Sequence, residues 1–68
     1  RMGRMKIAEN IKKFRTKRGW SQRVLADRAG FKHAIYIAHW ERGRRVPSLP
    51  SLEKLAKALK VSITELLK

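Results

Sequence analysis

The chain has 68 residues, enough for one domain at most, and it has no cysteine, so neither disulfides nor a thiolate metal site can supplement its core. Eighteen Lys and Arg against five Asp and Glu give a net charge of +13, which indicates a polyanionic partner: DNA, RNA or an anionic membrane surface. No apolar run is long enough for a membrane span and no signal peptide is visible, so we expect a soluble intracellular protein.

The N-terminal part of the chain predicts a mobile basic arm over residues 1–5, followed by a helix. Ile7, Ile11 and Phe14 lie at i, i+4 and i+7, the spacing of one helical face, and lysines lie outside that face. Gly19 follows a basic last turn, and glycine is the residue that most often ends a helix. We therefore expect the first helix to begin near residue 6 and to end just before Gly19.

Two short helices are predicted next, separated by a tight turn. Ser21 is expected to be the N-cap of a second helix over about 21–29, which Gly30 ends. A third helix is expected over about 33–42, and it stops at Gly43. Two helices joined by a short turn that contains glycine are typical of a helix-turn-helix.

The C-terminal part predicts two further helices. Ser48 is a candidate N-cap for the fourth helix, and Pro50 falls in its first turn, where a missing N–H costs little. The fourth helix has a clear apolar stripe made of Leu49, Leu52, Leu55, Ala56 and Leu59. Ser62 and Glu65 have the spacing of a capping box for a short final helix. With no strand signal and no repeat, the sequence predicts one all-α domain of five helices over residues 1–68.

A series of fragments runs in order from about residue 7 to residue 67. These fragments are Ile11-x-x-Phe14-Arg15, Gly19-Trp20-Ser21-Gln22, Leu25-Ala26-x-x-Ala29-Gly30, Tyr36-Ile37, Trp40-Glu41-Arg42-Gly43, Arg45-x-Pro47-Ser48-Leu49 and Leu55-Ala56-x-Ala58-Leu59-x-Val61-Ser62. In this order and spacing the chain resembles the phage-repressor/Cro (XRE-like) family of helix-turn-helix domains. The resemblance implies a sequence-specific transcription regulator or repressor whose third helix lies in the major groove while the second crosses the DNA backbone.

The third helix can be divided into two faces at 100° per residue. If Ile37 lies at the centre of the buried face, then Ala34, Trp40 and Glu41 lie within about 60° of it, and the opposite face carries Ile35, Ala38, His39 and Arg42. The resemblance assigns base contacts to Ala34, Ile35 and His39, two of which fall on the opposite face. Arg42 and His39 can donate hydrogen bonds to base edges, whereas apolar side chains can contact only thymine methyl groups. The predicted base contacts are Ala34, Ile35, Ala38, His39 and Arg42.

Phosphate contacts are expected from the start of the second helix and from the loop after the third. Free backbone N–H groups at a helix N-terminus can bind a phosphate, and serine and glutamine add side-chain donors there. Gln22 matches the glutamine with which members of the family contact a phosphate. The predicted phosphate contacts are Ser21, Gln22, Arg23, Lys32, Tyr36, Arg44 and Arg45.

The resemblance also implies a structural ion pair, between Arg15 of the first helix and Glu41 of the third. The sequence departs from the family in the turn before the third helix, since Gly30 and Glu41 enclose ten residues where the family has nine. The usual Ser or Thr N-cap is also absent, and alanine and isoleucine replace most polar residues of the exposed face. These differences predict an altered recognition surface, natural or engineered.

Other classes of function have weaker support in the sequence. One Asp, four Glu and no Cys provide no paired carboxylates and no nucleophile beside a base, so we do not expect an enzyme. His33 and His39 are about 240° apart around a helix and cannot share a metal on one face. A protein-interaction module, an RNA binder and a membrane-surface peptide stay as alternatives, although the aromatic residues map inward rather than to a stacking surface.

The expected partners follow from these assignments. We predict double-stranded DNA as the main partner and a weak homodimer as a second one. We predict no cofactor, no metal, no membrane contact and no small-molecule substrate. The expected location is the cytoplasm of a prokaryotic cell, with the nucleoid.

Overall fold

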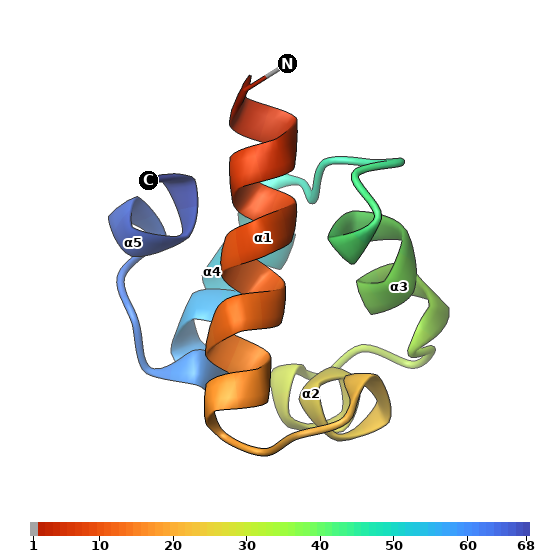
Figure 1. Ribbon diagram of the computed structural model, residues 1–68. Helices are drawn as coiled ribbons and strands as arrows, with labels where there is room; N and C mark the ends of the chain where they lie inside the picture. Colours follow the sequence, from red (N-terminus) through yellow and green to blue (C-terminus); the bar gives the residue numbers. More distant parts are fainter. Residues whose placement is uncertain (1) are drawn as a thin grey trace.

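The computed structural model describes the backbone of residues 2–68 and the side chains of residues 5–68, and within that range the chain forms five α-helices and no strand (Figure 1). The all-α, five-helix prediction is therefore confirmed. The helices are α1 (Met2–Lys17), α2 (Gln22–Ala29), α3 (Ile35–Glu41), α4 (Leu49–Leu59) and α5 (Ile63–Leu67).

Helix α1 begins earlier than predicted. Residues 2–5, which we assigned to a mobile arm, form its first turn, and Arg1 lies outside the described residues. The segment is Met-Gly-Arg-Met: methionine and arginine are good helix formers, glycine is a poor one, and no proline interrupts the segment. Once a packed helix exists, each added residue gains a hydrogen bond at little cost, so the helix extends to Met2. The predicted arm was wrong over residues 2–5.

Helix α3 is shorter than predicted, because it spans Ile35–Glu41 instead of residues 33–42. At its N-terminus Ala34 has no side-chain acceptor for the free N–H groups of the first turn. His33 takes part only in a turn, in which its carbonyl accepts from the N–H of Tyr36 at 3.4 Å. The helix therefore begins two residues later than the periodicity alone suggested.

Serine side chains cap three of the helices where the sequence predicted them. Ser21 Oγ accepts from the N–H of Val24 at 3.1 Å, and Ser48 Oγ accepts from the N–H of Ser51 at 3.3 Å. Ser62 and Glu65 form the reciprocal bonds of a capping box, at 2.9 and 3.1 Å. Each cap satisfies a backbone group that would otherwise lack a partner, a contribution of about 1 kcal/mol.

The core lies around α1, with α3 on one side of it and α4 and α5 on the other (Figure 1). The fully buried side chains come from every helix and include Ile11, Leu25, Ile37, Leu55, Leu59 and Leu66. One polar residue, Asn10, is also buried, and its Nδ2 donates to the carbonyl of Leu66 at 2.8 Å. This bond links α1 to α5 and satisfies the amide inside the core. No helix among the described residues is long and apolar enough to cross a membrane.

Candidate nucleic-acid interface

Helix α3 has one buried face and one exposed face, in the rotation that the sequence predicted. Ile37 is completely buried and Trp40 is buried beside it. On the other face Ile35 is 53% exposed, and Arg42 is exposed at the C-cap. An apolar residue on an exposed helical face is available to a partner. The structure therefore separates a packing face from a contact face.

The remaining predicted base-contact residues are less accessible than Ile35 and Arg42. Ala38 is half-buried, and Ala34 packs partly against the core just before α3 begins. His39 is also half-buried, and its Nδ1 is a buried atom without a hydrogen-bond partner among the described residues. Because Nδ1 is buried, Nε2 is the ring nitrogen that is left to His39 for a base edge.

An ion-pair cluster fixes α3 against α1 and α2. Arg15 donates from Nε and Nη2 to the two carboxylate oxygens of Glu41, at 2.6 and 3.0 Å, and from Nη1 to the carbonyl of Trp20 at 2.8 Å. The side chains of Arg15 and Glu41 are only 11% and 5% exposed. A two-pronged guanidinium–carboxylate contact sets orientation as well as distance. The cluster therefore determines where the contact face of α3 points.

Gln22 takes part in this cluster. Its Nε2 donates to Glu41 Oε1 at 3.0 Å, so the glutamine that we assigned to a phosphate uses a donor inside the protein. The sequence contained no signal for this bond, because Gln22 and Glu41 are 19 residues apart and belong to different helices. Gln22 therefore lies at the start of α2, where phosphate contacts are predicted, and also bonds to the carboxylate that pairs with Arg15.

The other predicted phosphate contacts lie at the surface. Ser21, Lys32, Arg44 and Arg45 are exposed. Arg23 is exposed too, and its guanidinium bonds to Asp27 and to the carbonyl of Lys32. The loop arginines have no partner of this kind among the hydrogen bonds of the described residues. Arg44 and Arg45 are therefore available to contact a phosphate.

An aromatic cluster next to α3 was only partly anticipated. Tyr36 is 45% exposed and stacks on Trp40, with the ring centroids 6.3 Å apart. Phe31, directly after Gly30, packs edge-on against Trp40 at 5.2 Å, and Lys54 lies over its ring. Aromatic pairs of this geometry add stability beyond the area they bury. The turn between α2 and α3 is therefore packed onto α3 through the contact of Phe31 with Trp40.

No group of three or more His, Cys, Asp or Glu comes together in the part of the chain that the structure describes. What the surface does bring together is an exposed helical face, a set of exposed guanidinium groups and the capped start of α2. This arrangement suits the recognition of a polyanion with edges that accept hydrogen bonds.

The comparisons with known proteins agree with this geometry. The family model described as helix-turn-helix matches residues 11–66. An uncharacterised HTH-type transcriptional regulator of Sinorhizobium fredii is 38% identical over 60 residues, which are 88% of this chain and 77% of that protein. The crystal structure of the hypothetical transcription factor NHTF from Neisseria superposes with a TM-score of 0.91 at 38% identity, covering 97% of this chain and 75% of that one.

A further solved structure is similar over nearly its whole length. The restriction-modification controller protein C.AhdI from Aeromonas hydrophila superposes with a TM-score of 0.85 at 37% identity, covering 91% of this chain and 92% of that one. The family match covers most of the chain, and the three proteins named here are each more than 30% identical and matched over more than two thirds of their length. The chain therefore belongs to the helix-turn-helix family, and it is a DNA-binding transcription regulator.

Proposed function

We propose that this regulator binds a specific sequence of double-stranded DNA, with α3 in the major groove. The observation that carries the proposal is the separation of faces on α3: Ile37 and Trp40 are buried, whereas Ile35 and Arg42 face outward beside exposed loop arginines. The major groove is wide enough for one helix, and each base pair presents a distinct pattern there.

The contact face of α3 assigns a chemical role to each candidate residue. Arg42 and the Nε2 of His39 are the donors, which suit guanine O6 or N7. Ile35 has no polar atom beyond its backbone and is matched to a thymine methyl group. Ala38 and Ala34 are smaller and less exposed, so they allow close approach and contribute little discrimination of their own. A face with so few polar side chains supports the view that the recognition surface is altered from the family pattern.

Phosphate binding is assigned to the start of α2 and to the loop after α3. Ser21 accepts the capping bond with its oxygen, so its hydroxyl hydrogen is free to donate to a phosphate. Arg44 and Arg45 supply charge on the other side of the contact face, and Arg23, Lys32 and Tyr36 extend the same surface. Gln22 can contact a phosphate only if it gives up or shares its bond to Glu41.

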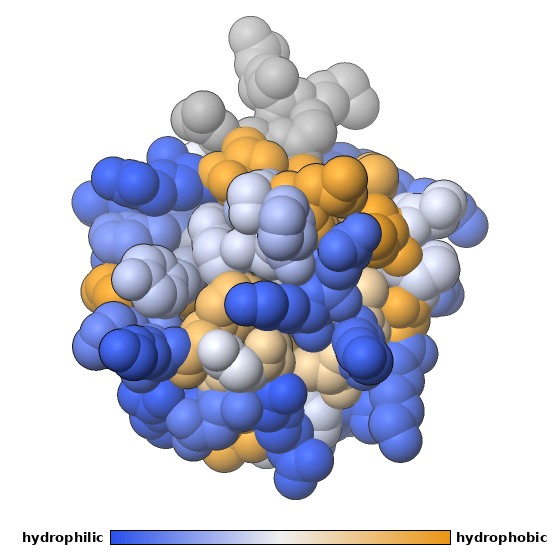
Figure 2. Space-filling view, turned by 180° about the vertical axis from the view of Figure 1, so that it is seen from behind, coloured by the Kyte–Doolittle hydropathy of each residue, from blue (hydrophilic) through white to orange (hydrophobic). Residues whose placement is uncertain are grey.

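A weak homodimer is the second partner that we propose. Several large apolar side chains are exposed outside α3, in the first part of α1, in the loop before α4, at the start of α4 and in α5: Met5, Val46, Leu49 and Leu67. Figure 2 shows apolar residues gathered at one end of the molecule among a mostly hydrophilic surface. A second copy covering such residues would place two contact helices on one operator. Sedimentation at rising protein concentration tests this, with Leu49→Lys as the variant expected to stay monomeric.

We propose a binding role without catalysis, in the cytoplasm where a bacterial chromosome lies. The relatives are transcription regulators, and the described residues offer no cluster of catalytic or metal-ligating groups. A module that binds only other proteins is the competing function. Salt distinguishes the two functions. Binding to DNA releases the counterions of the neutralised phosphates and so weakens steeply as the salt concentration rises, whereas binding to another protein releases far fewer ions and depends less on salt.

The experiment that tests the DNA proposal combines selection from randomised duplexes with a salt titration. If about six phosphates are neutralised, log K against log[salt] should have a slope near −5. Ile35→Ala and His39→Ala should keep that slope and relax the preference at particular base pairs by about 1–3 kcal/mol. Arg45→Ala should instead weaken binding to all duplexes alike and make the slope about one unit less steep. A flat salt response would contradict duplex binding altogether.

A further inference from the structure

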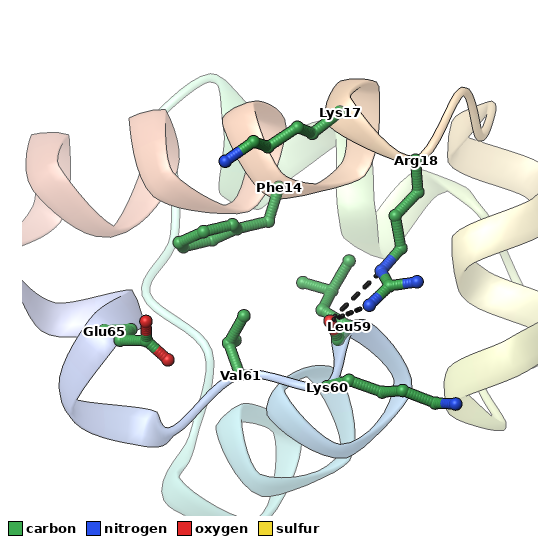
Figure 3. A pocket seen from close by; sticks show the side chains of 7 residues that line it. All are labelled: Phe14, Lys17, Arg18, Leu59, Lys60, Val61 and Glu65. Atoms are coloured by element: carbon green, nitrogen blue, oxygen red, sulfur yellow. Dashed lines mark hydrogen bonds between the residues drawn. The ribbon is translucent and has the colours of Figure 1, made fainter.

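A second site lies on the side of α1 away from α3. A groove of about 450 Å³ opens between the C-terminal part of α1 and the connection from α4 to α5 (Figure 3). We call it the basic groove, and its lining consists of Phe14, Lys17, Arg18, Leu59, Lys60, Val61 and Glu65. None of these residues is among the proposed base or phosphate contacts, so the basic groove shares no residue with the proposed DNA interface.

The floor of the basic groove is apolar. Phe14 and Val61 face one another across it, and Leu59 lies behind them (Figure 3). Phe14 and Val61 are only partly buried, so each keeps apolar surface that a bound group can cover. Removing apolar surface from water favours binding in proportion to the area covered. The floor therefore favours an apolar side chain over a hydrated phosphate.

The rim of the basic groove is positive and is not neutralised from within. Lys17 extends over the side of Phe14, and Lys60 runs along the opposite edge below Arg18 (Figure 3). Glu65 is the one carboxylate of the lining, and its Oε1 already accepts from the N–H and the hydroxyl of Ser62. Three cations therefore face one engaged carboxylate, which attracts an anionic partner.

Two features fix the positions of cationic residues at the rim. Arg18 donates from Nε and Nη2 to the carbonyl of Leu59, at 3.1 and 2.9 Å, and its guanidinium also lies against Trp20. Lys60 is the only described non-glycine residue with a positive φ, at 59°. This conformation belongs to the C-cap of α4, and it fixes the direction in which the Lys60 side chain leaves the helix.

We propose that the basic groove binds an acidic segment of a partner protein, with one apolar side chain seated between Phe14 and Val61 and carboxylates at Lys17 and Lys60. The size of the groove suits a short segment rather than a whole domain. Because the basic groove shares no residue with the proposed DNA interface, the segment and a DNA duplex bind at the same time. The regulator thereby links DNA to a second protein, an activity beyond DNA binding itself.

Charge argues against a second copy of this chain as the occupant. The chain has a net charge of +13, and three of its five acidic residues are engaged in internal bonds: Asp27, Glu41 and Glu65. Another copy would therefore bring mainly cations to a cationic rim, and like charges in close contact are unfavourable. The apolar end proposed for self-association also shares no residue with the lining of the groove.

The test uses the full chain and a fluorescent acidic peptide, acetyl-Asp-Glu-Leu-Phe-Asp-Glu-amide, measured by anisotropy with duplex DNA in excess. The duplex occupies the proposed DNA interface and leaves the basic groove open. Lys17→Glu should weaken peptide binding about tenfold, and Lys60→Glu should act in the same direction. The matched control Lys12→Glu changes an equally exposed lysine of α1 outside the groove and should change binding less than twofold. A peptide with serine in place of its leucine and phenylalanine should bind much more weakly.

Each other result overturns the proposal. Absence of peptide binding, or equal effects of Lys17→Glu and Lys12→Glu, would mean that the groove is not the site. Equal binding of the serine peptide would leave only diffuse attraction between charges. If Lys17→Glu weakened duplex binding as much as Arg45→Ala does, the groove would belong to the DNA surface. If Lys17→Glu abolished self-association, the occupant would be a second copy. Thermal midpoints of the variants show that each remains folded, and the duplex titration checks the DNA proposal separately.

Discussion

The ion pair between Arg15 and Glu41 and the ion pair between Arg23 and Asp27 have the same length, yet they lie in opposite surroundings. Each has a nitrogen–oxygen distance of 2.6 Å. The side chains of Arg15 and Glu41 are 11% and 5% exposed, whereas those of Arg23 and Asp27 are 52% and 61% exposed. The first pair joins α1 to α3, and the second joins residues one turn apart on α2.

Burial, and not distance, separates the roles of the two pairs. A buried charge that loses its partner cannot recover its hydration, so the Arg15–Glu41 pair is costly to break. An exposed pair exchanges its partner for water at little cost. The buried pair therefore holds α3 in position, while Arg23 can leave Asp27 and bind a phosphate. Arg15 and Glu41 therefore hold the contact helix in place, whereas Arg23 is able to contact DNA itself.

The largest effect should come from Glu41→Ala. The substitution leaves the guanidinium of Arg15 beside the core without its carboxylate and also removes the acceptor of Gln22. We expect a loss of about 3–5 kcal/mol in the free energy of unfolding, measured by urea denaturation. The double variant Arg15→Ala/Glu41→Ala should lose less than the sum of the two single variants. An unchanged denaturation midpoint would mean that the pair does not hold α3.

Arg15→Lys should have an intermediate effect, because it keeps the charge and removes the geometry. Arg15 donates in three directions, to both carboxylate oxygens and to the carbonyl of Trp20. A lysine ammonium cannot reproduce this planar arrangement, so we expect a loss of about 1–3 kcal/mol. Urea denaturation beside the wild type measures it. If Arg15→Lys were as stable as the wild type, charge alone would explain the pair.

The distance along the chain between two contacting residues explains what the sequence could and could not predict. The serine caps and four of the five residues of the apolar stripe of α4 depend on neighbours a few residues apart, so local spacing was enough to find them. Leu49, the fifth residue of the predicted stripe, is instead 61% exposed. The bonds from Gln22 to Glu41 and from Arg18 to the carbonyl of Leu59 join residues 19 and 41 positions apart, and no local pattern encodes them. The predicted start of α3 was wrong because the family's capping Ser or Thr is absent there. Ala34 takes the N-cap position and has no side-chain oxygen to accept a hydrogen bond from the first turn.

A smaller effect, of opposite sign, should come from Lys60→Gly. Lys60 is exposed and ends α4 in the left-handed conformation, with φ at 59°. Glycine adopts this conformation without the steric cost that lysine bears, so the substitution should stabilise the fold by about 1 kcal/mol. Lys57→Gly is the control, because it places glycine inside α4 and should destabilise by about 1 kcal/mol. Thermal and urea denaturation measure both; a destabilised Lys60→Gly would mean that the side chain matters more than the backbone.

The smallest effect should come from Asp27→Ala, the exposed counterpart of Glu41→Ala. Asp27 lies in the last turn of α2, where the helix dipole disfavours a negative charge, and Arg23 precedes it, the less favourable order for a pair at i,i+4. The unfavourable position of Asp27 thus nearly cancels the stabilisation from the ion pair, and the free energy of unfolding should change by no more than about 0.5 kcal/mol.

Release of Arg23 should nevertheless steepen the salt dependence of duplex binding by up to about one unit, because a further cation becomes free to contact a phosphate. A loss of stability as large as that of Glu41→Ala would show that exposure does not separate the two pairs. Unchanged stability with an unchanged salt slope would instead remove Arg23 from the phosphate contacts.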